Sequence, residues 1–438
     1  MKTWLSVVMT LVVLAGCSKD LQGTQSFDPA AEPAAQPVAA RSNLNSSVAR
    51  TEFAELVRRS VATSPTTAAG TANVLASQSR IEAERGAFRP QLNAETSLTS
   101  DGDTVPILRL SQIIYDGGKV SSRVGLRQIE ARQTWLSELS ELSAQSFEAI
   151  EAIIDLDRNR RLEVQARQNL ERTEALVSDL QSRFDAGAGS VADLLAGQGR
   201  QSNAETELAQ AETNVELATA TWIEVFGSRP SAIPTIPPAP VLAGTTSQAM
   251  VERSPRLRTQ VAVSEVRQQE VVVAERATRP TLSAILETDF NEGSIDNGAQ
   301  ARLGVNVPIY QGGSARANVE TARANLQQSE ADAEELRREL QRNLSQALEE
   351  TNSIQRRLAT ARRAVEINEQ ALDAARGQFN IGRSTIVQIL DALRELNLAQ
   401  VRVIQLEAQA RRAEYAVLAV TGDILDALGV AQPTDPTL

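Results

Sequence analysis

The sequence predicts a mainly α-helical fold with a small β part, built from long antiparallel coiled-coil hairpins in an internal two-fold repeat. Aromatic residues make up only 3% of the 438 residues, a composition that favours extended helices over large mixed α/β cores. Two proline-free tracts, residues 119–184 and 314–379, space their apolar residues as helices do. The motif IYDGG before the first tract recurs as IYQGG before the second, which indicates two copies of one architecture.

The chain begins with a predicted lipoprotein signal peptide. Residues 1–17, MKTWLSVVMTLVVLAGC, combine one positive charge, an apolar stretch too short for a comfortable spanning helix, and small residues before a cysteine. The ending LAGC resembles the lipobox of bacterial lipoproteins, which implies that Cys17 is lipidated and, because Ser18 follows it, that the protein lies in the outer membrane. An ordinary secretory signal that contains a cysteine is the alternative. Cys17 is the only cysteine, so no internal disulfide can form.

The first structural repeat, residues 49–230, follows a predicted flexible tether. The tether, residues 18–48, is rich in Ala, Pro, Gln and Ser, a composition that cannot form a core. In the first repeat a helical tract runs from the Ser-Pro pair at 64–65 to the Arg-Pro pair at 89–90. Its counterpart in the second repeat runs from the Ser-Pro pair at 254–255 to the Arg-Pro pair at 279–280.

A β-hairpin is predicted after each of these tracts, at about 91–115 and about 281–310. In QLNAETSLTS the residues Leu92, Ala94, Thr96 and Leu98 fall on one face, and DGDT then turns the chain. Strands of about 10 residues are long enough to cross a bilayer when tilted. Open strand edges are not tolerated in lipid, and a barrel needs at least eight strands. Four membrane strands per chain therefore require an oligomer.

Long helices and their tips follow each hairpin. The first long helix, 119–184, leads through a tip at 185–192 to a return helix, and the second, 314–379, leads through a tip at 380–386 to another. Gly187 and Gly382 are expected to supply left-handed caps at the helix ends. A proline-rich connector, 231–244, separates the first repeat from the second, 245–428, and a tail follows at 429–438.

The composition argues against several functional classes. The chain has no histidine, which removes the commonest general base and transition-metal ligand, and we expect no enzyme, cofactor or metal site. Gly118-Lys119 is not part of a phosphate-binding GxxxxGK[ST] motif. The net charge of −11 disfavours nucleic acid, because phosphate binding requires concentrated Lys and Arg.

In the order of these elements the chain resembles the TolC-like outer-membrane factors of bacterial efflux pumps and type I secretion systems. The resemblance covers nearly all of residues 49–428 and depends on the duplicated glycine motif with matched tips. It implies a homotrimer in which three chains contribute twelve strands to one β-barrel and twelve helical rods to a periplasmic tunnel. It also implies two partners, a periplasmic adaptor protein and an inner-membrane transporter of ABC or RND type, besides outer-membrane lipid.

The resemblance gives the duplicated motif a place at the membrane boundary. The glycine pairs would let a descending strand turn into a helix within a few residues, and the tyrosines would lie at the headgroup level, where amphipathic rings prefer to be. Ordinary packing at a strand end is the alternative for the tyrosines. The residues concerned are Tyr115, Gly117, Gly118, Tyr310, Gly312 and Gly313.

The resemblance also implies a gate at the periplasmic tips. Asp391 falls on the position of an acidic ring, and Gln388 stands where the family often has a second acid. Asp193 falls on a position that helps to hold the entrance shut, and its partner position is occupied by Phe379, which lacks the usual tyrosine hydroxyl. Three copies of Asp391 would repel one another and attract cations.

Three further roles at the tips follow from the same resemblance. Arg383 and Ser384 stand near the place of a gating arginine. The glycine tips at Gly187 and Gly382 would dock the adaptor, since exposed loops at rod ends are natural docking surfaces. The alternative for the gate residues is that they are ordinary solvated polar groups on turns.

The expected function is passive, gated export across the outer membrane for a tripartite system. The C-terminal run RRAEYAVLAVTGDILDALGV favours type I secretion, whereas a lipobox is frequent among drug-efflux factors, so efflux of drugs or other small molecules is the alternative. A lipid-anchored periplasmic coiled-coil scaffold is the alternative from another class. It explains the helices but not the paired alternating hairpins.

Overall fold

The structure, a computed structural model, describes residues 47–98, 104–242, 246–289 and 300–436, and all of them belong to one unit. The predicted leader and most of the tether, with the expected lipidation site Cys17, lie outside the described residues. The elements follow one another in the order η2 Ser47–Arg50, α2 Glu52–Thr63, α3 Pro65–Arg85, η3 Gly86–Phe88, β1 Gln91–Leu98, β2 Thr104–Tyr115, α4 Lys119–Asp185, α5 Val191–Phe226, α6 Ser247–Arg253, α7 Pro255–Arg276, β3 Thr281–Asp289, β4 Gln300–Asn306, α8 Ser314–Asn380, α9 Ile386–Thr421 and α10 Asp423–Leu428.

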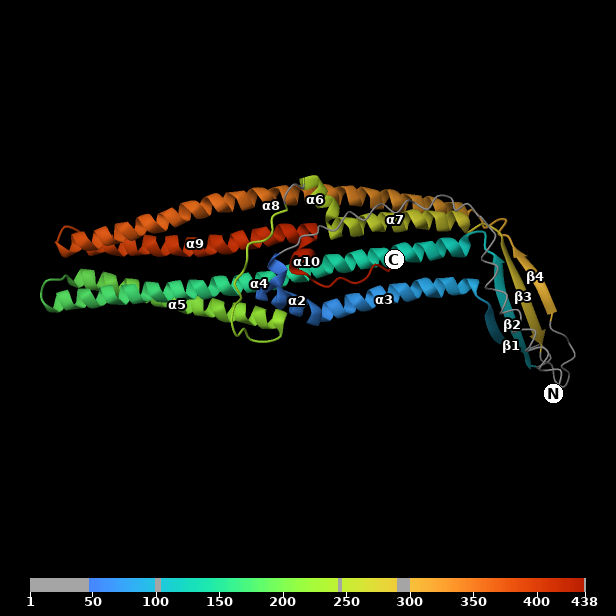
Figure 1. Ribbon diagram of the computed structural model, residues 1–438, viewed down its shortest axis with the longest axis horizontal. Helices are drawn as coiled ribbons and strands as arrows, with labels where there is room; N and C mark the ends of the chain where they lie inside the picture. The colour runs from blue at the N-terminus through green and yellow to red at the C-terminus, as the bar shows by residue number, and fades with distance from the viewer. Residues whose placement is uncertain (1–46, 99–103, 243–245, 290–299, 437–438) are drawn as a thin grey trace. The chain divides into compact units, whose positions relative to one another are not determined.

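Two long helical hairpins dominate this arrangement, α4 with α5 and α8 with α9. Helices α4 and α8 have 67 residues each, which corresponds to a length of about 100 Å. Contacts between α4 and α9 join the two hairpins, and the shorter helices α3 and α7 pack along the part of α4 nearest the strands (Figure 1). The fold is the mainly helical one with a small sheet that the sequence predicts.

Local sequence explains where these long helices begin and end. Each starts at a glycine in the left-handed region, Gly118 with φ 83° and Gly313 with φ 85°. Each long helix ends shortly before a second left-handed glycine in the turn of its hairpin, Gly187 with φ 72° and Gly382 with φ 71°. No proline interrupts either helix. Among the described residues, none of the helices combines the length and the apolar character needed to cross a membrane.

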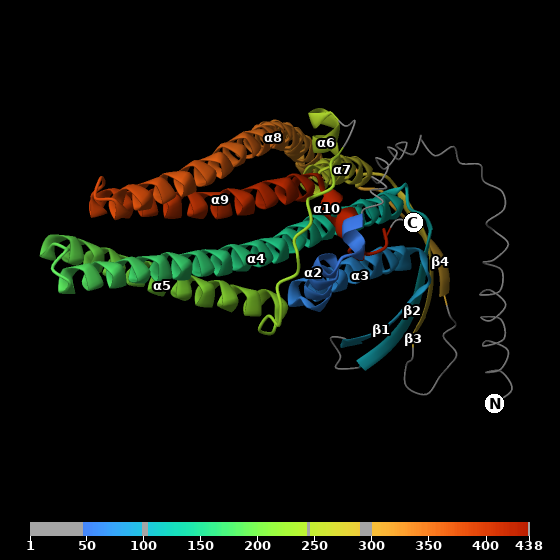
Figure 2. The same cartoon turned by 60° about the vertical axis from the view of Figure 1, so that its left-hand side comes forward.

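The four described strands form one antiparallel sheet in the order β1-β2-β3-β4. Figure 2 shows this sheet at the far end of α3, α4, α7 and α8 from the two helical tips. The second hairpin differs from its expected extent of about 281–310, because β4 ends at Asn306. Pro308 cannot donate a hydrogen bond to a ladder, and no other described strand lies beyond β4.

The main hydrophobic core lies where α2, α4, α9 and α10 meet. Phe53 and Tyr415 are fully buried there with ring centroids 5.5 Å apart. The proline-rich connector crosses this core without regular structure, and the carbonyl of Pro237 accepts a hydrogen bond from the Tyr415 hydroxyl at 3.1 Å. The C-terminal tail also returns to the core, where the Trp135 indole donates to the carbonyl of Pro433 at 2.9 Å.

Candidate functional site: sheet faces, helix starts and helical tips

The sheet has one apolar and one polar face. Residues that lie opposite each other on neighbouring strands share a face, so one row across all four strands can be followed from its register. One such row is apolar and consists of Leu92, Leu110, Leu286 and Ala301. The next row, on the other face, is polar and consists of Asn93, Arg109, Glu287 and Gln300.

An ion-pair network connects the strands on the polar face. The Arg109 guanidinium lies 3.4 Å from a carboxylate oxygen of Glu95 and 3.4 Å from one of Glu287. Arg302 approaches the same Glu287 oxygen at 2.8 Å. These charges face away from the leucines, which suits a wall with lipid on one side and water on the other. The sequence analysis did not single out these four residues, although their alternation with the leucines was a usable signal.

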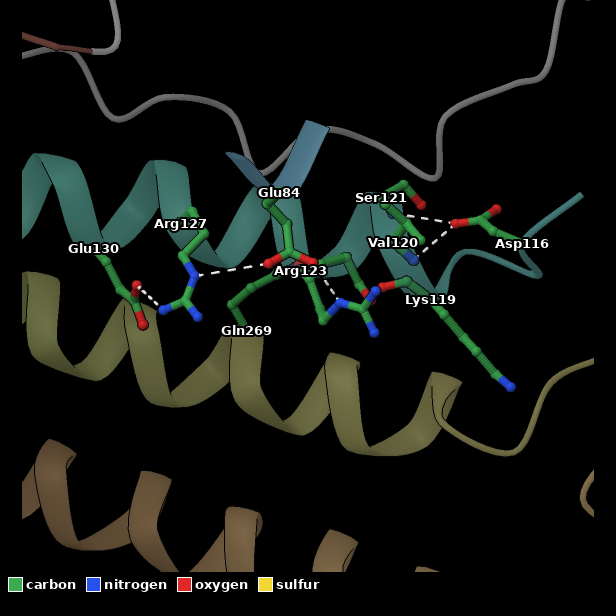
Figure 3. Close-up of polar contacts among 10 residues, drawn as sticks. Glu84, Asp116, Lys119, Val120, Ser121, Arg123, Arg127, Glu130 and Gln269 are labelled. Carbon is green, nitrogen blue, oxygen red and sulfur yellow. Dashed lines mark hydrogen bonds and ion pairs between the residues drawn. The ribbon is translucent and has the colours of Figure 1, made fainter. Parts of the chain in front are cut away.

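The first strand-to-helix turn is capped by Asp116. Its carboxylate accepts hydrogen bonds from the backbone N–H groups of Gly118, Val120 and Ser121 at 2.9, 2.9 and 3.1 Å, and Figure 3 shows the bonds from Val120 and Ser121. Burial opposes the charged carboxylate, but these hydrogen bonds outweigh burial, so the pKa of Asp116 lies below its usual value. A negative charge at the first turn of α4 also complements the helix dipole.

The start of α4 is held between α3 and α7. Arg123 pairs with Glu84 of α3 at 2.5 Å, and Arg127 lies 3.9 Å from the same carboxylate (Figure 3). On the other side, the Gln269 amide of α7 donates to the carbonyl of Ser122 at 2.8 Å. The geometry of this turn is therefore fixed by neighbours from both repeats.

The glycine pair in this first turn is closely packed. A Cβ atom on Gly117, whose φ is +61°, would lie 2.7 Å from the Pro280 carbonyl oxygen and 2.8 Å from Cβ of Arg279. The Arg279 guanidinium also donates to the Gly117 carbonyl at 3.3 Å. A side chain at Gly117 would thus need both an unfavourable backbone conformation and space that is already occupied.

The second glycine pair has an open environment instead. Gly312 and Gly313 have positive φ values of 62° and 85°, yet no atom lies within 4 Å of a Cβ placed on either of them. The tyrosine of the second motif is also the more exposed one, since Tyr115 is 52% exposed and Tyr310 is 86% exposed. In a single chain the two copies of the motif therefore have unequal surroundings.

The two helical tips are joined by a contact that the sequence analysis missed. The Arg183 guanidinium of α4 lies 4.7 Å above the centroid of the Phe379 ring of α8 and donates to the Asn380 side-chain oxygen at 3.1 Å. The expected gate residue Phe379 thus binds a cation through its ring face. The corresponding position of the second repeat holds Gln378. This difference in charge between the repeats was the available signal for Arg183, but it does not identify Phe379 as its partner.

The other expected gate residues lie around the same two tips. Asp391 is exposed on α9, and Asp193 is half-buried in the first turn of α5. Gln388 forms a capping box with Thr385 at the start of α9, and its side-chain oxygen accepts from the Ser384 hydroxyl. Arg383 is exposed in the loop between α8 and α9.

Beneath these polar residues the tips share a small apolar core. It contains Leu residues from both hairpins and brings α4, α5, α8 and α9 together. Its buried members are Leu180, Leu194, Leu372, Ile386, Ile389, Leu390, Leu393 and Leu396. The tip loops at Gly187 and Gly382 lie outside this core, where nothing is within 4 Å of a Cβ placed on either glycine.

Comparison with known proteins agrees with this architecture. Residues 246–423 match the family described as outer membrane efflux protein. The outer membrane efflux protein BepC of Brucella suis biovar 1 (strain 1330) is 24% identical over 368 residues, which cover 79% of this chain and 80% of BepC.

Solved structures share the fold over most of the chain. CusC, whose crystal structures address its transmembrane channel formation, superimposes with a TM-score of 0.77 at 16% identity and covers 84% of this chain and 91% of its own. The CmeC outer membrane channel of Campylobacter jejuni superimposes with a TM-score of 0.76 at 13% identity and covers 88% of each chain. The matched family consists of passive channels, so the prediction that the chain is not an enzyme is confirmed. Residues 246–423 thus match the outer membrane efflux protein family, the chain is similar to BepC over most of its length, and its fold is that of TolC-like outer-membrane channels.

Proposed function

We propose that three copies of this chain form one gated, passive export channel across the outer membrane, as the outer component of a tripartite secretion or efflux system. The observation that carries this proposal is the sheet with one apolar face, one polar face and two open edges. Open edges are costly in lipid, and four strands cannot close a barrel. Three chains supply twelve strands, which is enough for a closed barrel with the apolar rows facing lipid.

The membrane boundary lies in this proposal at the strand-to-helix turns. Tyr115 is the last residue of β2 and Tyr310 follows the end of β4 by four residues, and both are exposed. Amphipathic rings of this kind favour the headgroup region. Lipidation at Cys17 adds an anchor in the same membrane, and the helical hairpins extend from the barrel into the periplasm.

The periplasmic entrance lies at the two helical tips. Three copies of Asp391, exposed on α9, form an acidic ring that attracts cations and resists closure because like charges repel. This entrance is surrounded by Asp193, Phe379, Arg383 and Ser384. The capping box of Gln388 fixes the start of α9, about one turn before Asp391. The exposed loops at Gly187 and Gly382 dock a periplasmic adaptor, which connects to an ABC or RND transporter of the inner membrane.

Two classes of cargo are compatible with this proposal, proteins and small molecules. The C-terminal sequence favours protein cargo of a type I secretion system. The relative BepC is named an efflux protein, and this favours drugs or other small molecules. The scaffold alternative does not account for a sheet that is apolar on one face and charged on the other.

The test is single-channel conductance of the purified protein in a planar bilayer, beside Asp391→Ala. We expect discrete cation-favouring steps in the wild type and a smaller cation preference in Asp391→Ala, read as the reversal potential in a salt gradient. Asp332→Ala is the matched control, because Asp332 is also exposed but lies in the half of α8 remote from the tip. An unchanged reversal potential in Asp391→Ala contradicts the acidic ring, and absence of any conductance in both proteins contradicts the channel.

A further inference from the structure

The polar face of the sheet holds one carboxylate between two arginines. The Oε2 atom of Glu287 on β3 lies 3.4 Å from Nε of Arg109 on β2 and 2.8 Å from a terminal nitrogen of Arg302 on β4. The Glu287 side chain is 21% exposed, whereas that of Arg302 is 57% exposed. The two guanidinium groups, called the arginine fork below, therefore share one carboxylate and remain accessible from the solvent.

The register of the sheet explains why these side chains meet. Arg109 lies directly opposite Glu287, and Arg302 lies opposite Ile285, two residues from Glu287 on the same face. Long side chains reach one another from such diagonal positions. The two arginines would repel each other across the single strand between them, and the Glu287 carboxylate offsets this repulsion.

Glu95, the other glutamate of the network, has a different position. It lies 3.4 Å from Arg109, is 53% exposed, and has no ion pair with Arg302 among the described residues. Loss of the Glu95 charge would leave Arg109 paired with Glu287. Loss of the Glu287 charge would leave Arg302 with no carboxylate partner among the described residues. Only Glu287 therefore occupies the arginine fork.

The arginine fork is remote from the two helical tips. Arg109 precedes the end of β2 at Tyr115 by six residues, which is about 20 Å along an extended strand. The sheet itself is at the opposite end of the long helices from the tips (Figure 2). In the proposed barrel the polar face lines the water-filled lumen, so the arginine fork lies on the path of the cargo and far from Asp391.

We propose that Arg109 and Arg302 form a binding site for a carboxylate group of the cargo, and that Glu287 occupies this site in the absence of cargo. The inference rests on the proposed channel and adds a point at which its wall binds cargo. Arginine binds carboxylates through charge-assisted hydrogen bonds. Conduction also requires that a bound group leaves again, and Glu287, as an internal competitor, displaces it.

The experiment measures block of the full-length protein in a planar bilayer by citrate, a tricarboxylate, added on the barrel side at low salt. Wild type is compared with Glu287→Gln, with Glu95→Gln, and with the double variant Glu287→Gln and Arg302→Gln. Glu95→Gln is the matched control, because it removes the same charge from the same face and leaves the arginine fork occupied. Glu287→Asp, which keeps the charge on a shorter side chain, is the second variant if Glu287→Gln does not assemble.

We expect Glu287→Gln to be half-blocked at a citrate concentration about tenfold below that of wild type, because an external carboxylate then replaces the internal one. Glu287→Asp should be intermediate, and Glu95→Gln and the double variant should resemble wild type. Added salt should weaken the block. An oligoglutamate peptide is the second probe. Block by both probes supports the site and extends it to acidic segments of a protein cargo, and block by citrate alone supports it for small acids.

Three results would overturn the inference and leave the channel standing. Equal block of Glu287→Gln and Glu95→Gln would assign the effect to net charge, and equal block of Glu287→Gln and its double variant would remove Arg302 from the site. Wild-type citrate sensitivity of a conducting Glu287→Gln or Glu287→Asp channel would show that Glu287 does not compete for the arginines. Absence of conductance in wild type after confirmed reconstitution contradicts the proposed channel instead.

Discussion

At the scale of single residues, Arg183 is the only described side chain shown to connect the α4 tip to the α8 tip through both a ring and a hydrogen bond. Its guanidinium contacts the Phe379 ring and the Asn380 side chain, and it is also paired with Asp179 on its own helix at 3.0 Å. The pair with Asp179 directs the guanidinium, and the cation–π contact contributes about 0.5 to 1 kcal/mol at an exposed site. In the proposed trimer this contact occurs three times, and we expect it to favour a closed entrance.

We therefore expect Arg183→Ala to increase the open-channel conductance or the open probability in a planar bilayer. Arg376→Ala is the matched control, since Arg376 is an exposed arginine on α8 one turn before Phe379 with no ion pair among the described residues. Equal gating of Arg183→Ala and wild type would show that the contact does not hold the entrance. A similar increase in Arg376→Ala would assign the effect to net charge.

A second single residue, Glu138, is buried and has no ionic partner among the described residues. It is 5% exposed, one of its carboxylate oxygens has no hydrogen bond, and it occupies the space beside Gly70 of α3 where a Cβ would be. Burial, with a smaller contribution from the nearby Glu141, raises the pKa of Glu138 above its usual value. The folded state therefore binds this proton more tightly than the unfolded state.

The stability contribution of Glu138 should fall as the pH rises from the usual glutamate pKa through the raised one, because the proton is then lost from the folded state. We expect Glu138→Gln to raise the midpoint of thermal unfolding at pH 7.5 and to leave it nearly unchanged at pH 4. The measurement is circular dichroism of α-helix content during heating in detergent. Glu148→Gln, which changes an exposed glutamate of the same helix, is the control. A midpoint difference that does not depend on pH would argue against titration of Glu138.

At the scale of elements, the two long helices begin with similar glycines but different caps. Asp116 accepts three backbone hydrogen bonds at the start of α4. At the same place before α8, Gln311 accepts bonds from Ser314 through its backbone carbonyl. The charged cap is thus confined to the first repeat, where the turn is also packed against Pro280.

We expect Asp116→Ala to lower the free energy of unfolding by about 1 kcal/mol, the usual cost of losing a side-chain cap, and Gln311→Ala to change it little. Because the pKa of Asp116 is lowered on folding, its contribution should be lost as the pH falls below the ordinary aspartate value of about 3.9. Denaturant unfolding in detergent at pH 7 and pH 3 measures both effects. Equal losses in the two variants would contradict the difference between the caps.

The elements themselves were largely predictable from sequence, because their signals are local. Glycine pairs, proline-free helical periodicity and period-2 alternation define the helices and the hairpins near their actual bounds. The end of β4 at Asn306 was not predicted, because it is set by the partner strand β3, which begins at Thr281 opposite Asn306. The contacts of Arg183 with Phe379 and of Arg109 with Glu287 were also missed, because they join residues from different repeats.

At the scale of the whole molecule, the repeat makes the inequality of the two glycine turns informative. Arg279 contacts Gly117 inside the chain, whereas Gly312, its equivalent in the second repeat, has nothing within 4 Å of a Cβ placed on it. In the proposed trimer we expect Arg89 of a second copy to complete the equivalent contact with Gly312. We therefore expect removal of Arg279 to affect a single chain and removal of Arg89 to affect the interface between chains. The two variants separate folding of the protomer from closure of the barrel.

We expect Arg89→Ala to lower the temperature at which the oligomer dissociates into single chains in dodecyl sulfate, while protease resistance of the helical hairpins stays as in wild type. Arg279→Ala should lower both, because its contacts with the Gly117 turn lie within the protomer. Glu82→Ala is the control for the long surface pair with Arg89, which contributes little at such exposure. If Arg89→Ala dissociates at the wild-type temperature, Arg89 does not cover Gly312, and the interface is held by the strand ladder alone.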